Sequence, residues 1–238
     1  MFNYSWVRDI NIYEKNVLKQ KSTYESFLND ENFKLSKENK HLLNGNWLFD
    51  YATNYSNTKP IEYYYTVPLN LLSGIKVPGH MQLQGYDTPK YVNTQYPWDG
   101  LENIKPPEIP EKFNPVGTYV KVFDMSLDKL DKVIITFEGV ESAYAVWLNN
   151  EFIGYKEDTF TTGSFDITSQ IKDKDNRLVV QVFKWCSGSW LEDQDFFRFS
   201  GIFRDVFITS VSESHAVDMK ISSKLINDYK DGELLVKL

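Results

Sequence analysis

The chain has 238 residues, of which 42% are hydrophobic and 16% aromatic, and its formal net charge is -7. This apolar content suffices for one large core or two unequal cores, so the sequence predicts a globular protein. The negative charge and the lack of a basic cluster argue against nucleic-acid and membrane partners, and no apolar run approaches the ~20 residues of a membrane helix.

The amino-terminal segment is polar and lacks the dense alternation of apolar and polar residues seen later. We predict that residues 1–42 form an extended arm that lies on another surface, with a short helix around Asn16 to Asn29. Alone, such an arm is expected to be disordered.

A β-domain is predicted to start at Leu43, because aromatic side chains then recur at every second position. The segment NGNWLFDY carries Trp47 and Phe49 in this pattern, and IEYYYTVPL repeats it with Tyr63 and Tyr65. The following stretch, from Gly79 to Pro115, is rich in Pro, Gly and Asn. Loops of that length are usually functional.

Short strands follow Pro115 in quick succession. They are expected in TYVKVFDM, KVIITFEGV, AYAVWLNNEFIGYKE, RLVVQVFKW and GIFRDVFITS. Asn149 and Asn150 lie where a hairpin turn is expected, since Asn tolerates the positive φ of two-residue turns. Asp166 is placed to cap a single helical turn. Strands at roughly 8- to 15-residue spacing, without βαβ units, predict an all-β jelly-roll sandwich.

The tail HAVDMKISSKLINDYKDGELLVKL reads as two further strands around a Tyr-Lys-Asp-Gly turn. Two strands joined by one turn are marginally stable alone. We therefore expect that the chain is truncated at Leu238, just after a second β-domain has begun.

Several kinds of chemistry lack their sequence signature. His41, His80 and His215 lack metal-ligand spacing, Cys186 has no partner for a disulfide, and no GxSxG, P-loop or GxGxxG motif occurs. The start MFNYSWVRDI lacks the basic and apolar regions of a signal peptide, so a cytoplasmic location is expected.

The segment WCSGSWLEDQDFFRFSGIFRD places acids among aromatic residues and then two arginines. If it is extended, Asp193 and Asp195 share one face and Glu192 lies on the other. Such carboxylates serve as an acid and base, as cation ligands or as acceptors for sugar hydroxyls. The structural alternative is a network in which Arg198 and Arg204 neutralise acids.

The loop YVNTQYPWDG offers Asn93 beside Tyr96 and Trp98. An amide among rings suits a neutral hydroxylated ligand, since rings stack on its apolar face and the amide bonds its hydroxyls. The alternative is an Asn that satisfies its own turn. His80, in PGHMQLQG, is the one loop histidine with a candidate function; the alternative is a bond to backbone.

Four segments resemble, in order and spacing, the amino-terminal domain of glycoside hydrolase family 2 β-galactosidases of the bacterial lactose-cleaving type. They are VPGHMQLQGYDTPKYVNTQYPW, NPVGTYVKVFDM, FEGVESAYAVWLNNEFIGYKEDTFTTGSFDIT and WCSGSWLEDQDFFRFSGIFRDV. The resemblance implies a jelly-roll sugar-binding domain at 43–210, preceded by the arm at 1–42, and an incomplete immunoglobulin-like domain at 211–238.

The resemblance also implies site residues. Asn93 and Asp195 would reach a galactose site completed by a TIM barrel, Asp195 would also bind a sodium ion, and Thr94 would line the same pocket. His80, Glu192 and Asp193 match family motifs without an implied ligand contact. Arg198 and Arg204 match as scaffold.

The implied reaction is retaining hydrolysis of terminal β-galactosides such as lactose, which needs two carboxyl groups about 5–5.5 Å apart. In the family both carboxyl groups belong to glutamates of the barrel, which are expected beyond Leu238. The magnesium ligands and the other sodium ligands are expected there too. This piece is therefore expected to be inactive and to bind neither ion strongly. The intact enzyme is expected to be a homo-tetramer.

Three alternatives remain at this stage. The chain is a free-standing carbohydrate-binding module, or itself a hydrolase that uses Asp193, Asp195 and Glu192, or the same domain of a β-glucuronidase. A glucuronide site needs cationic groups for the sugar carboxylate, and neither ligand loop supplies an obvious one.

Overall fold

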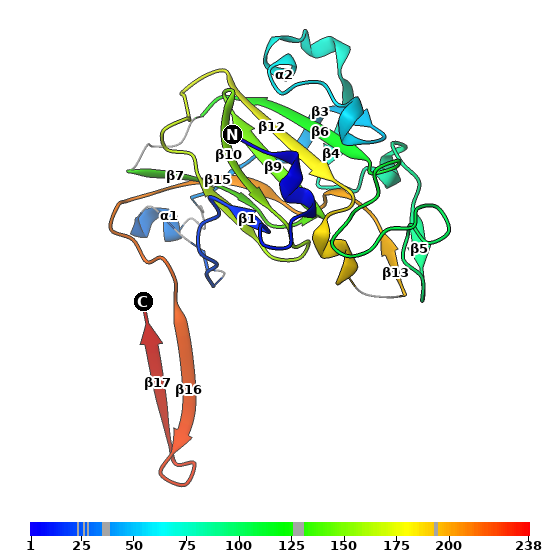
Figure 1. The fold of residues 1–238 in the computed structure, drawn as a ribbon. Coiled ribbons are helices and arrows are strands. Elements are labelled where there is room, and N and C mark those ends of the chain that lie inside the picture. The colour runs from blue at the N-terminus through cyan, green and yellow to red at the C-terminus, as the bar shows by residue number, and fades with distance from the viewer. Residues whose placement is uncertain (23, 26, 28, 35–38, 126–130, 193–194) are drawn as a thin grey trace.

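A computed structural model describes residues 1–22, 24–25, 27, 29–34, 39–125, 131–192 and 195–238. Two antiparallel sheets face each other as a sandwich, and a separate hairpin projects from it (Figure 1). The seven-stranded sheet runs, in spatial order, β1 (Glu14–Lys15), β10 (Glu151–Lys156), β9 (Ala143–Leu148), β12 (Asn176–Phe183), β6 (Val116–Phe123), β3 (Gly45–Ala52) and β4 (Ser73–Val77). The four-stranded sheet runs β11 (Gly163–Asp166), β7 (Lys132–Phe137), β15 (Val206–Val211) and β2 (His41–Leu42). The predicted all-β sandwich is confirmed.

Shorter elements complete the chain. Three two-stranded sheets pair β13 (Phe196–Arg198) with β5 (Lys90–Val92), β14 (Gly201–Ile202) with β8 (Val140–Glu141), and β16 (Lys220–Ile226) with β17 (Asp231–Lys237). The helices are α1 (Asp30–Lys34), α2 (Tyr63–Thr66) and the 3-10 turns η1 (Tyr4–Arg8), η2 (Tyr55–Asn57), η3 (Leu69–Leu71), η4 (Gln82–Gln84) and η5 (Ser187–Trp190).

The central strand β12 explains how the sequence builds two cores. Its alternate residues Leu178 and Val180 belong to the cluster between the two sheets. Val179 and Phe183, on the opposite face of the strand, belong to a second cluster on the outer face of the seven-stranded sheet. Since both faces of the strand are apolar, each face needs its own cover.

The amino-terminal segment supplies part of that second cover. Val7 is fully buried, and Phe2 and Trp6 pack against the same cluster. The expected helix around Asn16 to Asn29 is wrong: the described residues of that range are not helical. Sheet neighbours bond this stretch instead, as when Leu18 N donates to the carbonyl oxygen of Ser164.

The strand expected in IEYYYTVPL is also wrong, because the segment forms the one-turn helix α2. It buries Tyr64, whose hydroxyl donates to Asp50 Oδ2 at 2.8 Å. The helical turn hides the tyrosine between the two that the alternating pattern singled out.

Other turns follow the sequence. Asn149 and Asn150 have φ of 53° and 72°, and they join β9 to β10 as predicted. Asp166 Oδ1 accepts from Thr168 N at 2.9 Å and caps the turn after β11. In GIFRDVFITS, the expected strand is split into β14 and β15.

The hairpin of β16 and β17 stands apart from the sandwich (Figure 1). All its strand residues are exposed. The two predicted strands are therefore present, although their turn lies at residues 227–230, slightly before the expected Tyr-Lys-Asp-Gly position. Assignment of this hairpin to an immunoglobulin-like domain stays a prediction.

Candidate functional site

The ribbon of β5 and β13 brings the two main candidate residues together. Phe196 lies opposite Val92 in its register. Immediately beyond this pair, the backbone N–H of Asp195 donates to the carbonyl oxygen of Asn93 at 3.1 Å. Both side chains are exposed, as is that of Thr94, which follows directly. Two loops that are far apart in sequence thus present an amide and a carboxylate side by side.

The backbone of Asp195 is not extended, although the predicted placement of Asp195 and Glu192 on opposite faces assumed an extended segment. Its φ is 57°, in the left-handed region. The hydroxyl of Tyr91 donates to Asp195 Oδ1. Asp193 lies outside the described residues.

Glu192 is held in a partly buried network. Its Oε2 accepts from Arg198 Nη1 at 2.7 Å, and its Oε1 accepts from the Ser142 hydroxyl at 3.0 Å. Burial raises the pKa of Glu192. Burial, and then the nearby charge of Glu192, raise the pKa of Glu141 to about 7. Arg198 therefore contacts an acid of its own loop, which is what the scaffold interpretation expects.

His80 lies between two rings, with centroids 4.8 Å from Phe199 and 5.1 Å from Phe203. Its Nδ1 is 3.6 Å from Glu141 Oε2. Burial lowers the pKa of His80 and raises that of its carboxyl neighbour, so both groups favour their neutral forms. Arg204 lies over the ring of Phe203 and donates to a backbone carbonyl oxygen.

A second buried network, which sequence reasoning missed, anchors the loop before β5. Lys184 forms an ion pair with Asp87, and both side chains are 2% exposed. Gln82 Nε2 donates to Asp87 Oδ2 at 2.8 Å and to the Ser200 hydroxyl at 2.7 Å. The only sequence signal was an Asp in the otherwise loop-like GYDTP run.

Aromatic residues belong to both of the loops that carry the candidate pair, Asn93 and Asp195. The rings of Tyr96, Trp98 and Trp190 pack together, with Tyr96 and Trp98 stacked at a centroid distance of 5.4 Å. Trp190 Nε1 donates to the carbonyl oxygen of Glu108 at 2.8 Å. This cluster fixes the loop that follows Asn93.

The positions of the His, Cys, Asp and Glu side chains indicate where a metal ion could bind. Among the described residues, no group of three or more His, Cys, Asp or Glu side chains could hold a metal ion. Asp195 offers one carboxylate beside a carbonyl oxygen that already accepts a backbone bond. The sodium assignment of Asp195 stays a prediction.

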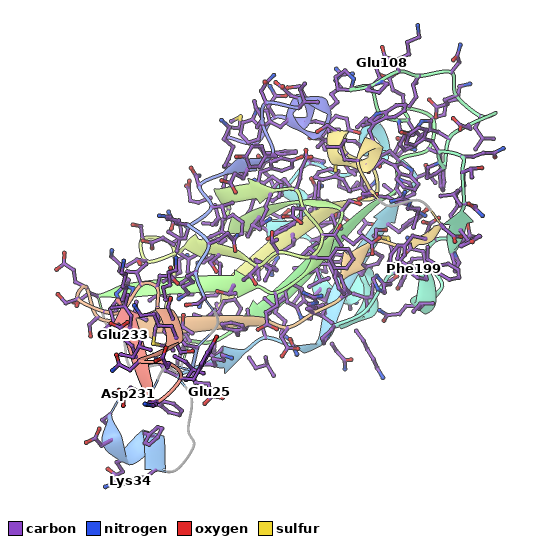
Figure 2. The ribbon with its side chains drawn as sticks, turned by 90° about the horizontal axis from the view of Figure 1, so that it is seen from below. Glu25, Lys34, Glu108, Phe199, Asp231 and Glu233 are labelled. Atoms are coloured by element: carbon purple, nitrogen blue, oxygen red, sulfur yellow. The ribbon has the colours of Figure 1, made fainter. Side chains whose placement is uncertain are left out.

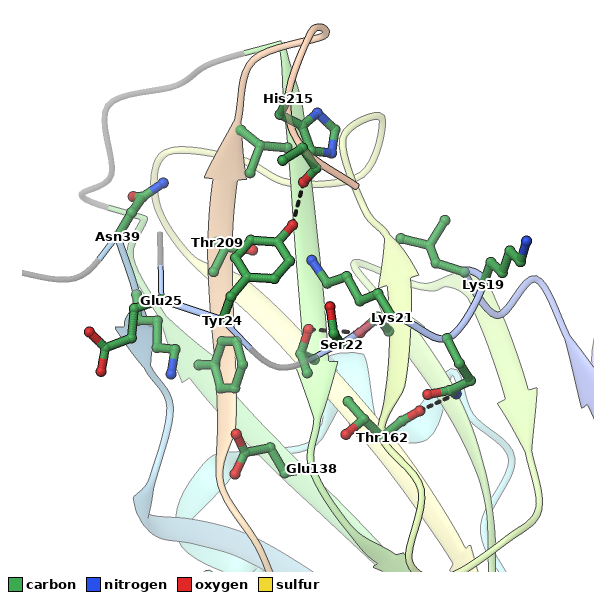
Figure 3. A pocket seen from close by; sticks show the side chains of 18 of the residues that line it. Lys19, Lys21, Ser22, Tyr24, Glu25, Asn39, Glu138, Thr162, Thr209 and His215 are labelled. Atoms are coloured by element: carbon green, nitrogen blue, oxygen red, sulfur yellow. Dashed lines mark hydrogen bonds between the residues drawn. The ribbon is translucent and has the colours of Figure 1, made fainter. Parts of the chain in front are cut away.

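A cavity of about 390 Å³ lies elsewhere, between the described residues of the segment 18–27 and the outer face of the four-stranded sheet (Figure 3). Thr136, Ser164 and Thr209 line its floor. Tyr24 closes one side, and its hydroxyl donates to the carbonyl oxygen of Ala216. Figure 2 shows the cavity residue Glu25 at the opposite end of the molecule from Phe199, which adjoins β13. This cavity is therefore separate from the candidate pair.

The family described as "Glycosyl hydrolases family 2, sugar binding domain" matches residues 40–211. The chain belongs to glycosyl hydrolase family 2. A β-galactosidase from Halalkalibacterium halodurans is 46% identical over 98% of this chain and 23% of its own length. One from Clostridium acetobutylicum is 43% identical over 98% of this chain and 26% of its own length. The family 2 chain thus spans about a quarter of these relatives.

Solved structures share the family 2 fold. A β-glucuronidase from an uncultured Clostridium species has a TM-score of 0.55 at 18% identity, covering 84% of this chain and 34% of its own. One from Bacteroides uniformis has a TM-score of 0.56 at 19% identity, covering 77% of this chain and 20% of its own. At such identities these similarities establish the fold alone. In the described part of this family 2 chain, no helix is long and apolar enough to cross a membrane.

Proposed function

We propose that this chain is the sugar-binding part of a β-galactosidase, which hydrolyses terminal β-D-galactose from β-galactosides such as lactose. The observation that carries the proposal is the contact between the Asn93 and Asp195 loops across the ribbon. The identity to β-galactosidases supports the substrate class.

Asn93 and Asp195 have complementary roles toward a sugar. The amide both donates and accepts, whereas the carboxylate only accepts. Sugar hydroxyls can both donate and accept, so the two side chains suit adjacent hydroxyls, with Thr94 at the edge. Hydrogen bonds to a charged acceptor are stronger than neutral ones, which gives Asp195 the larger share of the recognition.

The chemical step belongs to parts of the enzyme outside this chain. Retaining hydrolysis needs one carboxylic acid and one carboxylate about 5–5.5 Å apart. Glu192 is occupied by Arg198 and Ser142, so it is not free to act with Asp195 as such a pair. This arrangement disfavours hydrolysis by the 238-residue chain itself.

The proposal extends to the whole enzyme. Asp195 would supply one oxygen ligand to a sodium ion, with the remaining sodium ligands and the magnesium site in other segments. The enzyme would be a homo-tetramer. It would work in the cytoplasm, where its buried cysteine Cys186 would stay reduced.

The decisive experiment is kinetic, on the full-length protein encoded by the gene. The reading frame should continue past Leu238, and the product should cleave a nitrophenyl β-galactoside in preference to the β-glucuronide. Asn93→Ala and Asp195→Asn should each lower kcat/KM by about 10- to 100-fold. Asn227→Gly, at the exposed hairpin turn, keeps the left-handed backbone, and as the control it should leave kcat/KM unchanged.

Two outcomes would overturn this proposal. One is wild-type kcat/KM in both site variants. The other is a preference for the glucuronide. The cationic side chains of the ribbon make the second outcome unexpected, because Lys90 donates to the carbonyl oxygen of Pro97 and Arg198 binds Glu192.

A second candidate function is carbohydrate binding by the 238-residue chain alone. It is favoured by the exposure of Asn93 and Asp195, which leaves both accessible without other domains. Titration with galactose or lactose, followed by NMR, distinguishes the candidates. Saturable shifts at these two residues support independent binding, whereas their absence favours a site completed elsewhere. A nitrophenyl β-galactoside assay of the same chain, with Asp195→Asn as control, should show no hydrolysis.

A further inference from the structure

The Asp195 carboxylate is held from one side only. Oδ1 accepts the Tyr91 hydroxyl, while Oδ2 has no partner among the described residues. The backbone of the same residue is fixed by its bond to Asn93 O and by its left-handed φ of 57°. The main chain and one carboxylate oxygen are thus both restrained before a ligand binds.

We infer that Tyr91 is a positioning residue, whose hydroxyl orients the Asp195 carboxylate so that Oδ2 is presented to a sugar hydroxyl. The inference rests on the proposed function, because it concerns the same site. An exposed aspartate otherwise rotates freely about its side-chain torsions, and fixing it in advance lowers the entropy cost of binding.

The ribbon places Tyr91 where it can do this. It is the central residue of β5 and lies opposite Phe197 in the register. Asp195 directly precedes β13, so the tyrosine reaches the carboxylate diagonally across the ribbon. The hydrogen bond to Asp195 is the main reason why the pKa of Tyr91 is raised, so the hydroxyl stays a donor at neutral pH.

The Tyr91 ring is itself supported. Its centroid is 5.4 Å from that of Phe197, which stacks on Phe199 at 5.5 Å. Phe199 stacks on His80, whose partly buried ring also stacks on a second phenylalanine, Phe203. This row of rings links the tyrosine to the interior of the sandwich.

The test is a double-mutant cycle in the full-length enzyme with a nitrophenyl β-galactoside. Tyr91→Phe removes only the hydroxyl and should lower kcat/KM about 5- to 20-fold, chiefly through a higher KM. In the Asp195→Gly background, which removes the acceptor of the hydroxyl and tolerates the left-handed φ, the same change should cost less than about 2-fold. The Kd of a non-hydrolysable thiogalactoside should show the same coupling, which covers the case of a very slow double variant.

The control is Tyr86→Phe, which removes another tyrosine hydroxyl that bonds a backbone carbonyl oxygen, that of Gly74 at 2.8 Å. It should leave KM unchanged. Tyr91→Phe should also leave the urea midpoint of the 238-residue chain unchanged, as its hydroxyl is exposed.

Two results would overturn the inference. Equal losses from Tyr91→Phe in both backgrounds would mean that the tyrosine acts independently of Asp195. Wild-type KM in Tyr91→Phe would mean that it does not act at all. If Asn93→Ala and Asp195→Asn both keep wild-type kcat/KM, the proposed function fails instead. If they lose it while Tyr91→Phe does not, only this inference fails.

Discussion

The two ends of the sandwich are held together by different kinds of contact. At the end that carries Asn93 and Asp195, the loops are tied down by buried ionic groups such as the pair of Lys184 and Asp87. At the cavity end, the described residues between 18 and 27 are held by exposed side-chain hydrogen bonds, such as that from Ser22 Oγ to Asp218 Oδ1 in the segment after β15.

This contrast indicates at which end the loop conformation is fixed by specific contacts. A buried ion pair seldom adds more stability than apolar packing would. It does favour one arrangement of the loops, because any other arrangement leaves a buried charge without a partner. Exposed bonds compete with water and specify little. The end with buried networks is the one that carries the two side chains proposed to bind sugar, Asn93 and Asp195.

Lys184→Met should have the largest effect on stability. It leaves the Asp87 carboxylate buried without its ion partner, so the free energy of unfolding of the 238-residue chain should fall by about 3–5 kcal/mol. Urea unfolding measures it. Lys174→Met, at an exposed position, is the control and should change little. A loss below about 1 kcal/mol would show that the network does not anchor this end.

Glu141→Gln should change the pH dependence of stability. The folded pKa of Glu141 is about 7 and its reference value is 4.5, so the folded state holds the proton more tightly. The contribution of Glu141 to the free energy of unfolding therefore falls as pH rises from 4.5 through about 7. Glutamine cannot ionise, so the variant should be more stable than wild type at pH 8, by about 1–3 kcal/mol, and similar at pH 4.

Urea unfolding at several pH values checks this prediction. Glu151→Gln, on the exposed start of β10, serves as the control and should follow the wild-type curve. A Glu141→Gln variant that is less stable than wild type at pH 8 would contradict it.

Ser22→Ala tests the cavity end. The hydroxyl donates to Asp218 Oδ1 at 2.8 Å and accepts from Met219 N at 3.1 Å, and both bonds are exposed. The expected loss of unfolding free energy is below about 1 kcal/mol, much less than for Lys184→Met. A loss comparable to that of Lys184→Met would remove the distinction between the two ends.

Deletion of residues 220–238 should have the smallest effect. The strand residues of the hairpin are all exposed, so the sandwich loses no buried contact with them. The unfolding free energy should change by less than about 0.5 kcal/mol, as measured by urea unfolding. A substantial decrease would mean that the hairpin supports the sandwich.

Local sequence chemistry predicted those parts of the fold that depend on neighbouring residues. The turn at Asn149 and Asn150 was predictable because asparagine tolerates the positive φ that both adopt. The helix expected from Asn16 failed because backbone groups nearby pair with distant strands, as at Glu14 and Lys156. Such pairing depends on the whole fold.

The candidate site shows the same division. Family motifs selected Asn93 and Asp195, and their proximity required the pairing of two loops, which periodicity does not encode. Tyr91 and Asp87 went unnoticed for a related reason. Their roles arise from a carboxylate and an ammonium group in other parts of the chain.

The left-handed backbone of Asp195 affects how any mutational scan of this loop should be interpreted. Asparagine adopts that conformation readily, whereas alanine pays a steric cost there of about 1–2 kcal/mol. An alanine variant would therefore combine loop distortion with loss of the carboxylate and would overstate the weight of the charge. A glycine variant would adopt the left-handed conformation without that steric cost, but it would make the loop backbone more flexible. The difference between Asn and Ala at this single position measures how much of the apparent contribution of Asp195 belongs to its main chain.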